Sequence, residues 1–283
     1  MSTAGQGAPE QANSLAAARG RLVLVPNTLD LGAAAQELSS VLPLAVLQWA
    51  ARLQYWLVED AKSARAFLKR VHACVPLQSP LQALSITELP RPAKGRNEPP
   101  GPASSAARGS AAAAMSSLLA PALAGHDVGL LSEAGLPAVA DPGAAIVAAA
   151  HGLGLQVLPL PGPSSLLLAL AASGLDGQSF AFVGYLPQDA VARCERIREL
   201  EGVSRRMRQT QIFIETPYRN AALMGALLEC AAPATRLAVS VGLTLPGGWN
   251  RTATVAEWRR KTCGAADLPD LPDRLPAVFL LQA

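Results

Sequence analysis

Short runs of hydrophobic residues alternate with longer amphipathic segments along most of the chain, and this alternation predicts a fold of the α/β class. The runs are too short for helices and end in polar or turn-forming residues, as expected of buried strands. We expect strands at 22–25, 55–58, 128–131, 155–158, 180–183, 211–214, 237–241 and 277–281. We expect helices between them, at 33–52, 62–71, 111–123, 193–208, 218–230 and 254–260.

The chain changes character after Gly174, which predicts two α/β domains with a cleft between them. We expect a disordered N-terminal tail over 1–20, an N-terminal domain over 21–176 and a C-terminal domain over 177–283. Within the first domain, 90–109 is rich in proline and glycine and predicts a loop without regular structure.

The stretch 128–175 contains two successive passages from strand to loop to helix. The first strand runs into Ser132–Gly135, and the helix that follows is expected to begin with Asp141 as its N-cap residue. The second strand is broken by Pro161–Pro163, and Ser164–Ser165 opens another helix. Ligands of open α/β sheets bind outside the carboxyl ends of the strands. The sequence therefore predicts a ligand site at these two loops.

Charge adds one candidate contact surface to this picture. Only 16% of the residues are charged and the net charge is +3, which is too small to mark a general nucleic-acid binder. The segment 193–208 nevertheless carries six arginines against three glutamates. Either it is a solvated helix face with local ion pairs, or it is a contact for a polyanion. The arginines are Arg193, Arg196, Arg198, Arg205, Arg206 and Arg208.

Cysteine and histidine positions give no indication of a metal site. The four cysteines and three histidines lack the spacing of metal ligands, so we expect no metal and reduced cysteines. Residues 1–20 lack the apolar core of a signal peptide, and the longest apolar stretch, near 155–172, is interrupted by polar residues and prolines. We therefore expect a cytoplasmic protein with no membrane span.

Several segments together resemble a known family. They are S-E-A-G-L-P-A-V-A-D-P-G at 132–143, P-L-P-G-P-S-S-L-L-L-A-L-A-A-S-G-L at 159–175, F-A-F-V-G-Y-L-P at 180–187 and Q-T-Q-I-F-I-E-T-P-Y-R-N at 209–220, with weaker matches at 24–29 and 58–69. In order and spacing they resemble the tetrapyrrole methylase superfamily of S-adenosylmethionine-dependent methyltransferases. Within it, they are most similar to the branch of ribosomal small subunit methyltransferase I, which methylates a cytidine 2′-oxygen of ribosomal RNA.

The resemblance implies two α/β domains with S-adenosylmethionine in the cleft between them, usually in a homodimer. It also implies that the methyl donor lies against three strand-end loops of the first domain and one edge of the second. The implied cofactor-binding residues are Pro26, Asn27, Thr28, Ser132, Glu133, Ala134, Gly135, Pro163, Ser164, Ser165, Tyr185 and Leu186.

The chain departs from the family where substrate contacts are expected. The branch pattern E-D-T-R appears as E-D-A-K at 59–62, with Arg65 one turn later, and E-S-P-H-R appears as E-T-P-Y-R at 215–219. Arg65, Tyr218 and Arg219 are the candidate substrate-binding residues, because an arginine can hold a phosphate or a carboxylate. The acceptor is expected to be RNA, in ribosomal RNA or a ribosomal subunit.

Two carboxylates are candidate catalytic groups, Glu133 beside the donor loop and Glu215 at the second-domain turn. Each has an alternative role, because Glu133 could bind the loop backbone and Glu215 could open a helix with Arg219 as its local partner. Two alternative functions stay open. One is tetrapyrrole methylation, although the glycine-rich first loop of those enzymes is missing at 26–28. The other is a binding module that holds S-adenosylmethionine without catalysis.

Overall fold

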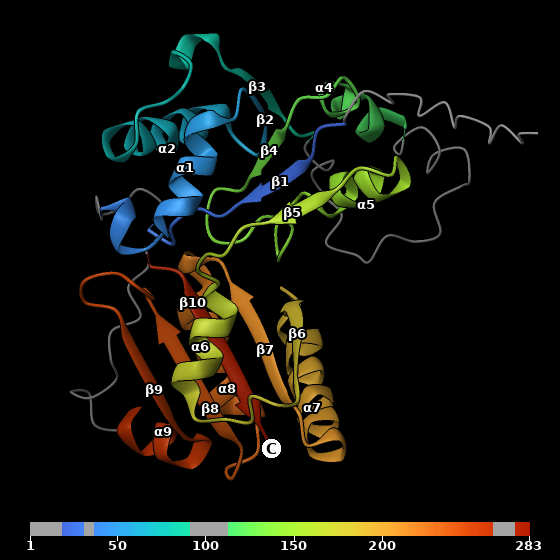
Figure 1. Ribbon diagram of the computed structural model, residues 1–283. Coiled ribbons are helices and arrows are strands. Elements are labelled where there is room, and N and C mark those ends of the chain that lie inside the picture. Colours follow the sequence, from blue (N-terminus) through green and yellow to red (C-terminus); the bar gives the residue numbers. More distant parts are fainter. Residues whose placement is uncertain (1–18, 31–36, 91–112, 263–274) are drawn as a thin grey trace, which may run out of the picture.

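A computed structural model describes residues 19–30, 37–90, 113–262 and 275–283 of this chain. It contains two five-stranded sheets with helices packed on both, so the predicted α/β class is confirmed (Figure 1). Nearly all of the predicted N-terminal tail and of the predicted loop at 90–109 lies outside the described residues.

The first sheet is entirely parallel, with strand order β3-β2-β4-β1-β5. Its three central strands, β2, β4 and β1, read as continuous apolar runs because helices cover both faces, whereas the edge strand β3 has the sequence S-I-T-E. All four residues of β4 are buried, as are three of the four residues of β1. The strands are β1 (Leu22–Val25), β2 (Tyr55–Val58), β3 (Ser85–Glu88), β4 (Val128–Leu131) and β5 (Val157–Pro159).

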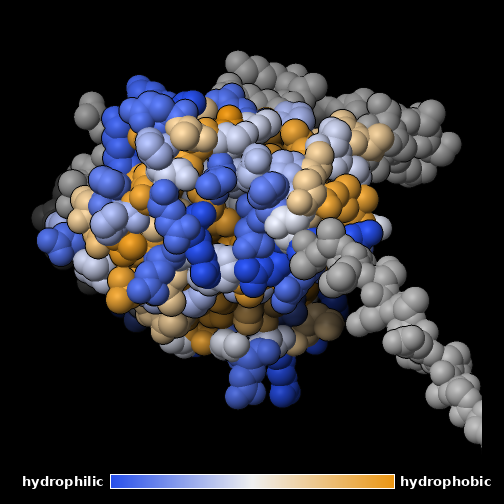
Figure 2. Space-filling model, turned by 45° about the horizontal axis from the view of Figure 1, so that its top comes forward, coloured by the Kyte–Doolittle hydropathy of each residue, from blue (hydrophilic) through white to orange (hydrophobic). Residues whose placement is uncertain are grey.

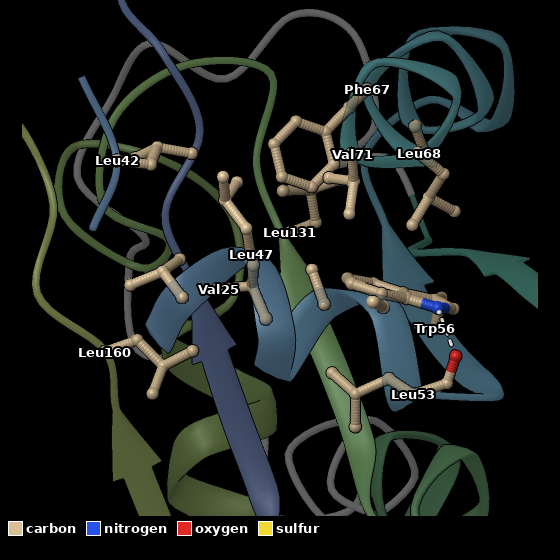
Figure 3. Packing of buried hydrophobic residues seen from close by; sticks show 14 of the residues in the cluster. Val25, Leu42, Leu47, Leu53, Trp56, Phe67, Leu68, Val71, Leu131 and Leu160 are labelled. Atoms are coloured by element: carbon tan, nitrogen blue, oxygen red, sulfur yellow. Dashed lines mark hydrogen bonds between the residues drawn. The ribbon is translucent and has the colours of Figure 1, made fainter. Parts of the chain in front are cut away.

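Two hydrophobic clusters hold helices against the two faces of this sheet. One cluster joins the sheet to η1 (Leu38–Ser40), α1 (Leu44–Arg52) and α2 (Ala61–Cys74), with η2 (Leu81–Ala83) nearby. At its centre the Trp56 indole is buried and donates a hydrogen bond of 3.2 Å to the carbonyl of Leu53 (Figure 3). The other cluster packs residues of α4 (Ala120–Leu123) and α5 (Ala144–Gly152) on the opposite face.

Helix α2 confirms the amphipathic helix predicted at 62–71. Asp60 is its N-cap residue and accepts a hydrogen bond of 2.7 Å from the backbone N–H of Ser63. Its apolar side chains are buried while Lys62, Arg65 and Lys69 are exposed. Figure 2, which turns the top of Figure 1 toward the viewer, shows hydrophilic side chains with hydrophobic ones between them over this part of the surface.

The second sheet has the strand order β6-β7-β10-β8-β9 and is mixed, because β6 and β7 are parallel and the other pairs are antiparallel. The helices α7 (Ala190–Met207), α8 (Asn220–Cys230) and α9 (Val255–Thr262) share one hydrophobic cluster with it, and η3 (Pro217–Arg219) precedes α8. The strands are β6 (Phe180–Tyr185), β7 (Thr210–Glu215), β8 (Arg236–Val241), β9 (Trp249–Thr254) and β10 (Ala277–Gln282). Neither β9 nor β3 was predicted from the sequence.

Helix α6 (Ser165–Ser173) connects the two sheets. It follows β5 of the first sheet, yet its buried residues Leu166, Ala169 and Leu170 pack against β7, β8 and β10 of the second (Figure 1). The predicted boundary near 176 comes after this helix, so the chain reaches the second sheet before that point. The short linker at 160–164 thereby lies where the two sheets meet.

The expectation that the cysteines are all reduced is wrong for two of them. Cys194 in α7 and Cys230 at the end of α8 form a disulfide, and Cys74 is a free, exposed thiol. The helices pack side by side, which brings together two positions 36 residues apart. Sequence spacing alone does not reveal such a pair.

Removing this disulfide is expected to lower the free energy of unfolding by about 2–3 kcal/mol, because the cross-link restricts the unfolded chain. The double variant Cys194→Ser/Cys230→Ser would be compared with the native chain by chemical denaturation. Cys74→Ser is the matched control and should leave the midpoint unchanged. An unchanged midpoint for the double variant would contradict a stabilising cross-link.

Within 19–30, 37–90, 113–262 and 275–283, no helix combines the length and the apolar character that crossing a bilayer requires. The same residues contain no cluster of three or more histidine, cysteine or acidic side chains able to hold a metal ion.

Candidate functional site: the strand-end loops of the first sheet

Asn27 joins the loops that follow β1 and β4. Its backbone N–H donates 2.9 Å to the carbonyl of Gly135, and its side-chain amide donates to the carbonyls of Ser132 (3.2 Å) and Glu133 (3.0 Å). Its side-chain oxygen accepts from the backbone N–H of Thr28 at 2.8 Å. Asn27 is buried, so these bonds are protected from water. The structure therefore brings together the predicted residues of these two loops.

Glycines bring the loop after β5 into contact with the same two loops. A Cβ placed on Gly162 would lie 2.2 Å from the Cβ of Pro26, so only glycine fits at this contact. Gly135 has a left-handed backbone (φ 66°), and a Cβ there would lie 3.4 Å from the carbonyl oxygen of Pro163. The loops at 26–28, 132–135 and 161–163 thus form one packed junction, which no local pattern in the sequence shows.

A buried ion pair supports the junction from α2. Asp30 is 2% exposed and pairs with Arg70 at 2.8 Å. The Thr28 hydroxyl donates 2.8 Å to the same carboxylate. A buried carboxylate needs such partners to compensate its desolvation. The pair therefore fixes the end of the β1 loop against the helix that follows β2.

Three carboxyl groups gather beside this junction: Glu59 after β2, Glu133 in the β4 loop, and Asp141 before α5. Burial raises the pKa of Asp141 to about 7, and the charges of Glu59 and Glu133 add to the rise. Burial also raises the pKa of Glu59, while the nearby Ser132 hydroxyl and Glu133 backbone N–H oppose the rise. The Ser132 hydroxyl does not reach hydrogen-bond geometry. Within the described residues, this buried hydroxyl and Oε1 of Glu59 have no hydrogen-bond partner.

The prediction that Asp141 is a helix N-cap is wrong. Helix α5 begins at Ala144 with Gly143 as its N-cap residue, and no side chain caps it. Ala138 and Ala140 both have left-handed backbones (φ 66° and 63°), and each such residue costs about 1–2 kcal/mol. This strained loop holds Asp141 in the acidic group and away from the helix start. Backbone strain of this kind is concentrated at functional sites.

The second sheet contributes Tyr185 and Glu215 to the same region. Burial raises the pKa of Tyr185, and the charges of Asp141 and Glu215 raise it further. The Tyr185 phenol is therefore close enough to interact with a carboxyl group from a first-sheet loop and with one from the second sheet. Glu215 is buried, accepts a hydrogen bond of 2.8 Å from the Thr216 backbone N–H, and pairs with Arg219 at 2.8 Å. A carboxylate held in this way is less available as a proton acceptor than Asp141.

The remaining predicted residues differ in how they lie. The side chain of Leu186 is buried in the core of the second sheet, so only its backbone can face a ligand. Ser164 is buried at the start of α6 without capping it, and Ser165 is the first residue of that helix. Tyr218 is 73% exposed. Arg65 is exposed on α2 and donates 3.2 Å to the Ala61 carbonyl, a bond within its own helix.

Two residues of this site were not assigned a role there from the sequence. Glu59 was noted only as part of the E-D-A-K pattern, and Asp141 was assigned to a helix cap. The one signal in the sequence that could have revealed Glu59 is its position. It directly follows a buried strand, as the residues of the other strand-end loops do. What the arrangement offers chemically is a group of acidic side chains suited to a cationic ligand, and a carboxyl group that exchanges its proton near neutral pH.

Known structures share this two-sheet fold. The methyltransferase CobJ has a TM-score of 0.50 and 15% identity, with 92% of this chain and 93% of that chain covered. A conserved hypothetical protein from Aeropyrum pernix has a TM-score of 0.52 and 17% identity, with 93% and 85% covered. At these identities, the likeness is one of fold alone.

The model of the tetrapyrrole (corrin/porphyrin) methylases matches residues 62–257, and the chain belongs to this family of methyltransferases. The family predicted from the motifs is confirmed. Relatives named ribosomal RNA small subunit methyltransferase I are 39% identical over 138 residues in Mesorhizobium japonicum (49% of this chain, 46% of the relative) and 43% identical over 97 residues in Vibrio cholerae (34% and 32%). The chain spans between about a third and a half of the length of the curated relatives that it matches.

Proposed function

We propose that this protein transfers a methyl group from S-adenosylmethionine to RNA, with ribosomal RNA as the substrate and a ribose 2′-oxygen as the acceptor. The proposal is carried by one observation, the junction of three strand-end loops. Beside it, a carboxyl oxygen of Glu59 and the Ser132 hydroxyl have no hydrogen-bond partner among the described residues. Family membership and the names of the relatives support the reaction and the acceptor. An enzyme with this substrate would work in the cytoplasm.

The residues of the junction fit the methyl donor. S-adenosylmethionine carries a sulfonium and an ammonium, and the acidic side chains of Glu59, Glu133 and Asp141 complement these charges. The unpartnered Ser132 hydroxyl and the Ser164 hydroxyl at the start of α6 are available for its polar groups. When bound, the donor supplies a methyl group on a positively charged sulfur that is ready for displacement. The loops then serve to align that methyl group with the acceptor oxygen.

We assign the general base to Asp141. A ribose hydroxyl must lose its proton as its oxygen attacks the methyl carbon, and a base is most effective when its pKa lies near the working pH. The pKa of Asp141, about 7, meets this condition. Glu133 stays a candidate for the same step. Glu215 is a weaker one, because it would first have to leave Arg219 and Thr216.

The turn that follows β7, at 216–219, is the proposed contact for RNA. Tyr218 is exposed beside Arg219, where its ring is free to stack on a base. Arg219 is held by Glu215, so it approaches a phosphate in a fixed orientation. Arg65 on α2 would add a second contact on the side of the first sheet.

Two measurements test the function. Isotope-labelled S-adenosylmethionine would be incubated with small-subunit ribosomal RNA from a strain that lacks this gene, and the product nucleosides would be identified by mass spectrometry. We expect a labelled 2′-O-methylnucleoside. Transfer to uroporphyrinogen or a precorrin, with none to RNA, would instead establish a tetrapyrrole methylase. Donor binding without transfer to any acceptor in a cell extract would indicate a binding module.

We also propose a homodimer, formed through the side of the second sheet that carries α6. Phe182 is opposite Ile212 in the parallel register, so both point to the side of α6. Phe180, Phe182 and Leu167 are 41%, 36% and 51% exposed. Exposed apolar side chains grouped on one face are typical of an interface.

Phe182→Glu is expected to convert the dimer to a monomer, because an unpaired charge at an apolar interface is costly. Light scattering coupled to size-exclusion chromatography measures the change. Val191→Glu introduces the same charge at an exposed apolar residue of α7, on the other face of the sheet, and should leave the dimer intact. A native chain that is monomeric at micromolar concentration would rule out the dimer.

A further inference from the structure

A pocket of about 740 Å³ lies at the amino ends of the parallel strands, at the opposite edge of the first sheet from the strand-end loops. Its walls come from the segments 19–21, 52–55, 125–127 and 154–156, which precede or begin β1, β2, β4 and β5. The proposed methyl transfer uses none of these residues. The pocket is therefore a separate site that needs its own explanation.

The charge of this pocket is positive. It is lined by Arg19, Arg21 and Arg52 and by a single carboxylate, Asp127. Asp127 is already committed to Arg21, which donates to it from its backbone N–H (2.9 Å), Nε (3.0 Å) and Nη2 (2.7 Å). These bonds hold the pKa of Asp127 below its usual range, so it stays ionised. Arg19 donates 2.8 Å to the carbonyl of Leu153, a bond that leaves its positive charge uncompensated. Arg19 and Arg52 thus keep their charges for a ligand with negative charge.

Trp49 fixes the position of the most available arginine. The guanidinium carbon of Arg52 lies 3.4 Å from the centre of the Trp49 ring, and that of Arg21 lies 4.7 Å from it. Stacking of this kind orients a guanidinium without using its hydrogen-bond donors. Arg52 makes no ion pair within the part of the chain that the structure describes. Its guanidinium therefore stays available to a ligand of the pocket that it lines, and the Trp49 ring restricts its orientation.

The aromatic and amide groups of the pocket indicate what accompanies the negative charge. The rings of Tyr55 and His126 lie side by side, with centroids 5.1 Å apart, and form an aromatic wall. Gln78 and Gln156 add amide groups, which can both donate and accept hydrogen bonds. The volume exceeds what a phosphate alone would fill and falls in the range of pockets for small organic ligands. Arginine, amide and aromatic groups together suit a phosphate that carries a base.

We propose that this pocket binds a nucleotide unit of RNA, with Arg52 on its phosphate and the Tyr55–His126 wall against its base. The choice of RNA as the source of the nucleotide rests on the proposed function. RNA bound here would contact the amino ends of the strands of the first sheet, whereas the reacting groups lie at their carboxyl ends. The pocket thus acts as an anchoring site that adds affinity for the substrate without taking part in methyl transfer.

The test measures binding of a labelled 12-nucleotide single-stranded RNA by fluorescence anisotropy, without the methyl donor. Arg52→Gln is expected to weaken binding about tenfold and to lower the slope of log affinity against log salt by about one, since one phosphate contact is lost. Arg260→Gln removes one positive charge from the exposed surface of α9 and is the charge-matched control. It should change the affinity less than about twofold.

The outcomes separate this pocket from the alternatives. Equal weakening by Arg52→Gln and Arg260→Gln would mean that net charge decides the affinity, and would overturn the pocket. A free nucleoside monophosphate that displaces RNA and binds as tightly as it does would overturn RNA as the natural source. Inorganic phosphate and an unphosphorylated nucleoside are expected to compete more weakly than the nucleoside monophosphate.

Two combinations of results distinguish a pocket that does not bind RNA from a protein that does not methylate RNA. If Arg52→Gln binds S-adenosylmethionine normally and loses RNA affinity while the native chain methylates no RNA, the pocket stands and the methylation proposal falls. If the native chain methylates RNA and Arg52→Gln leaves both RNA affinity and the salt slope unchanged, the pocket falls alone. An unchanged melting temperature of Arg52→Gln confirms that the comparison is made on folded protein.

Discussion

Replacing Gly162 by alanine is expected to lower the affinity for S-adenosylmethionine by about a hundredfold, because the new methyl group displaces one of the three loops by about an ångström. The added Cβ would meet the Cβ and Cγ of Pro26 at 2.2 and 2.5 Å. A proline ring is rigid and cannot turn aside as a long side chain would. Either the β1 loop or the β5 linker must therefore move. Overpacking of this kind costs about 1–3 kcal/mol of stability as well.

Calorimetric titration of the donor and chemical denaturation measure the two effects of Gly162→Ala separately. The matched control is Gly225→Ala in α8, where a Cβ would meet nothing within 4 Å. That change should stabilise the fold by about 0.5–1 kcal/mol, since alanine is the better helix former, and should leave donor affinity unchanged. Normal donor affinity in a folded Gly162→Ala variant would show that the junction does not hold the donor.

Replacing Asp141 by asparagine is expected to lower kcat by about a thousandfold, because an amide cannot take the proton of the acceptor hydroxyl. In the native protein, kcat/KM should rise with pH toward a plateau, with an apparent pKa of about 7. The direction follows from the base, which is inactive when protonated and accumulates as pH increases. Asp141 is faced by Glu59, Glu133 and Tyr185, so the apparent pKa belongs to this group of interacting side chains as a whole.

The pH dependence of stability gives a readout of Asp141 that does not depend on activity. Its pKa is raised in the folded protein above its ordinary value of 3.8. The contribution of Asp141 to the free energy of unfolding therefore favours the folded state most below pH 4. This contribution is lost as pH rises through about 7. Asp141→Asn should remove that loss and be more stable than the native chain above pH 7. Glu195→Gln, an exposed change on α7, is the control and should follow the native curve.

Three variants together identify the proton acceptor. Glu133→Gln and Glu215→Gln test the two carboxylates that the sequence suggested, and Asp141→Asn tests the one that the structure favours. If Glu133→Gln removes the pH-dependent step and Asp141→Asn keeps it, the base is Glu133. Donor affinity measured alongside separates loss of the base from loss of a charge that holds the cationic donor.

Much of the fold was predictable because its determinants are local. A buried parallel strand needs an uninterrupted apolar run, so β1, β2 and β4 were predicted with their observed bounds. The buried face of α2 follows from the 3.6-residue period of its apolar side chains. Motif order then indicated the family, and with it the three loops at 26–28, 132–135 and 163–165.

Other features depend on contacts between segments that are far apart in the chain. Helix α6 is apolar on nearly every side, so its sequence does not say which sheet it covers. The proton affinity of Asp141 depends on burial and on Glu59, which is 82 residues away. Likewise, the Cys194–Cys230 bond depends on how α7 packs on α8.

By itself, the sequence determined the α/β class, the methyltransferase family and the loops on which a donor site is expected, since each is encoded by residues close together in the chain. Only the tertiary structure decided that those loops form one junction, that Asp141 belongs to an acidic group, and that Arg52 is stacked on Trp49 in a separate pocket. The reason is physical. The charge and reactivity of a side chain depend on the water it loses and the neighbours it gains, and both are set by segments that meet only when the chain folds.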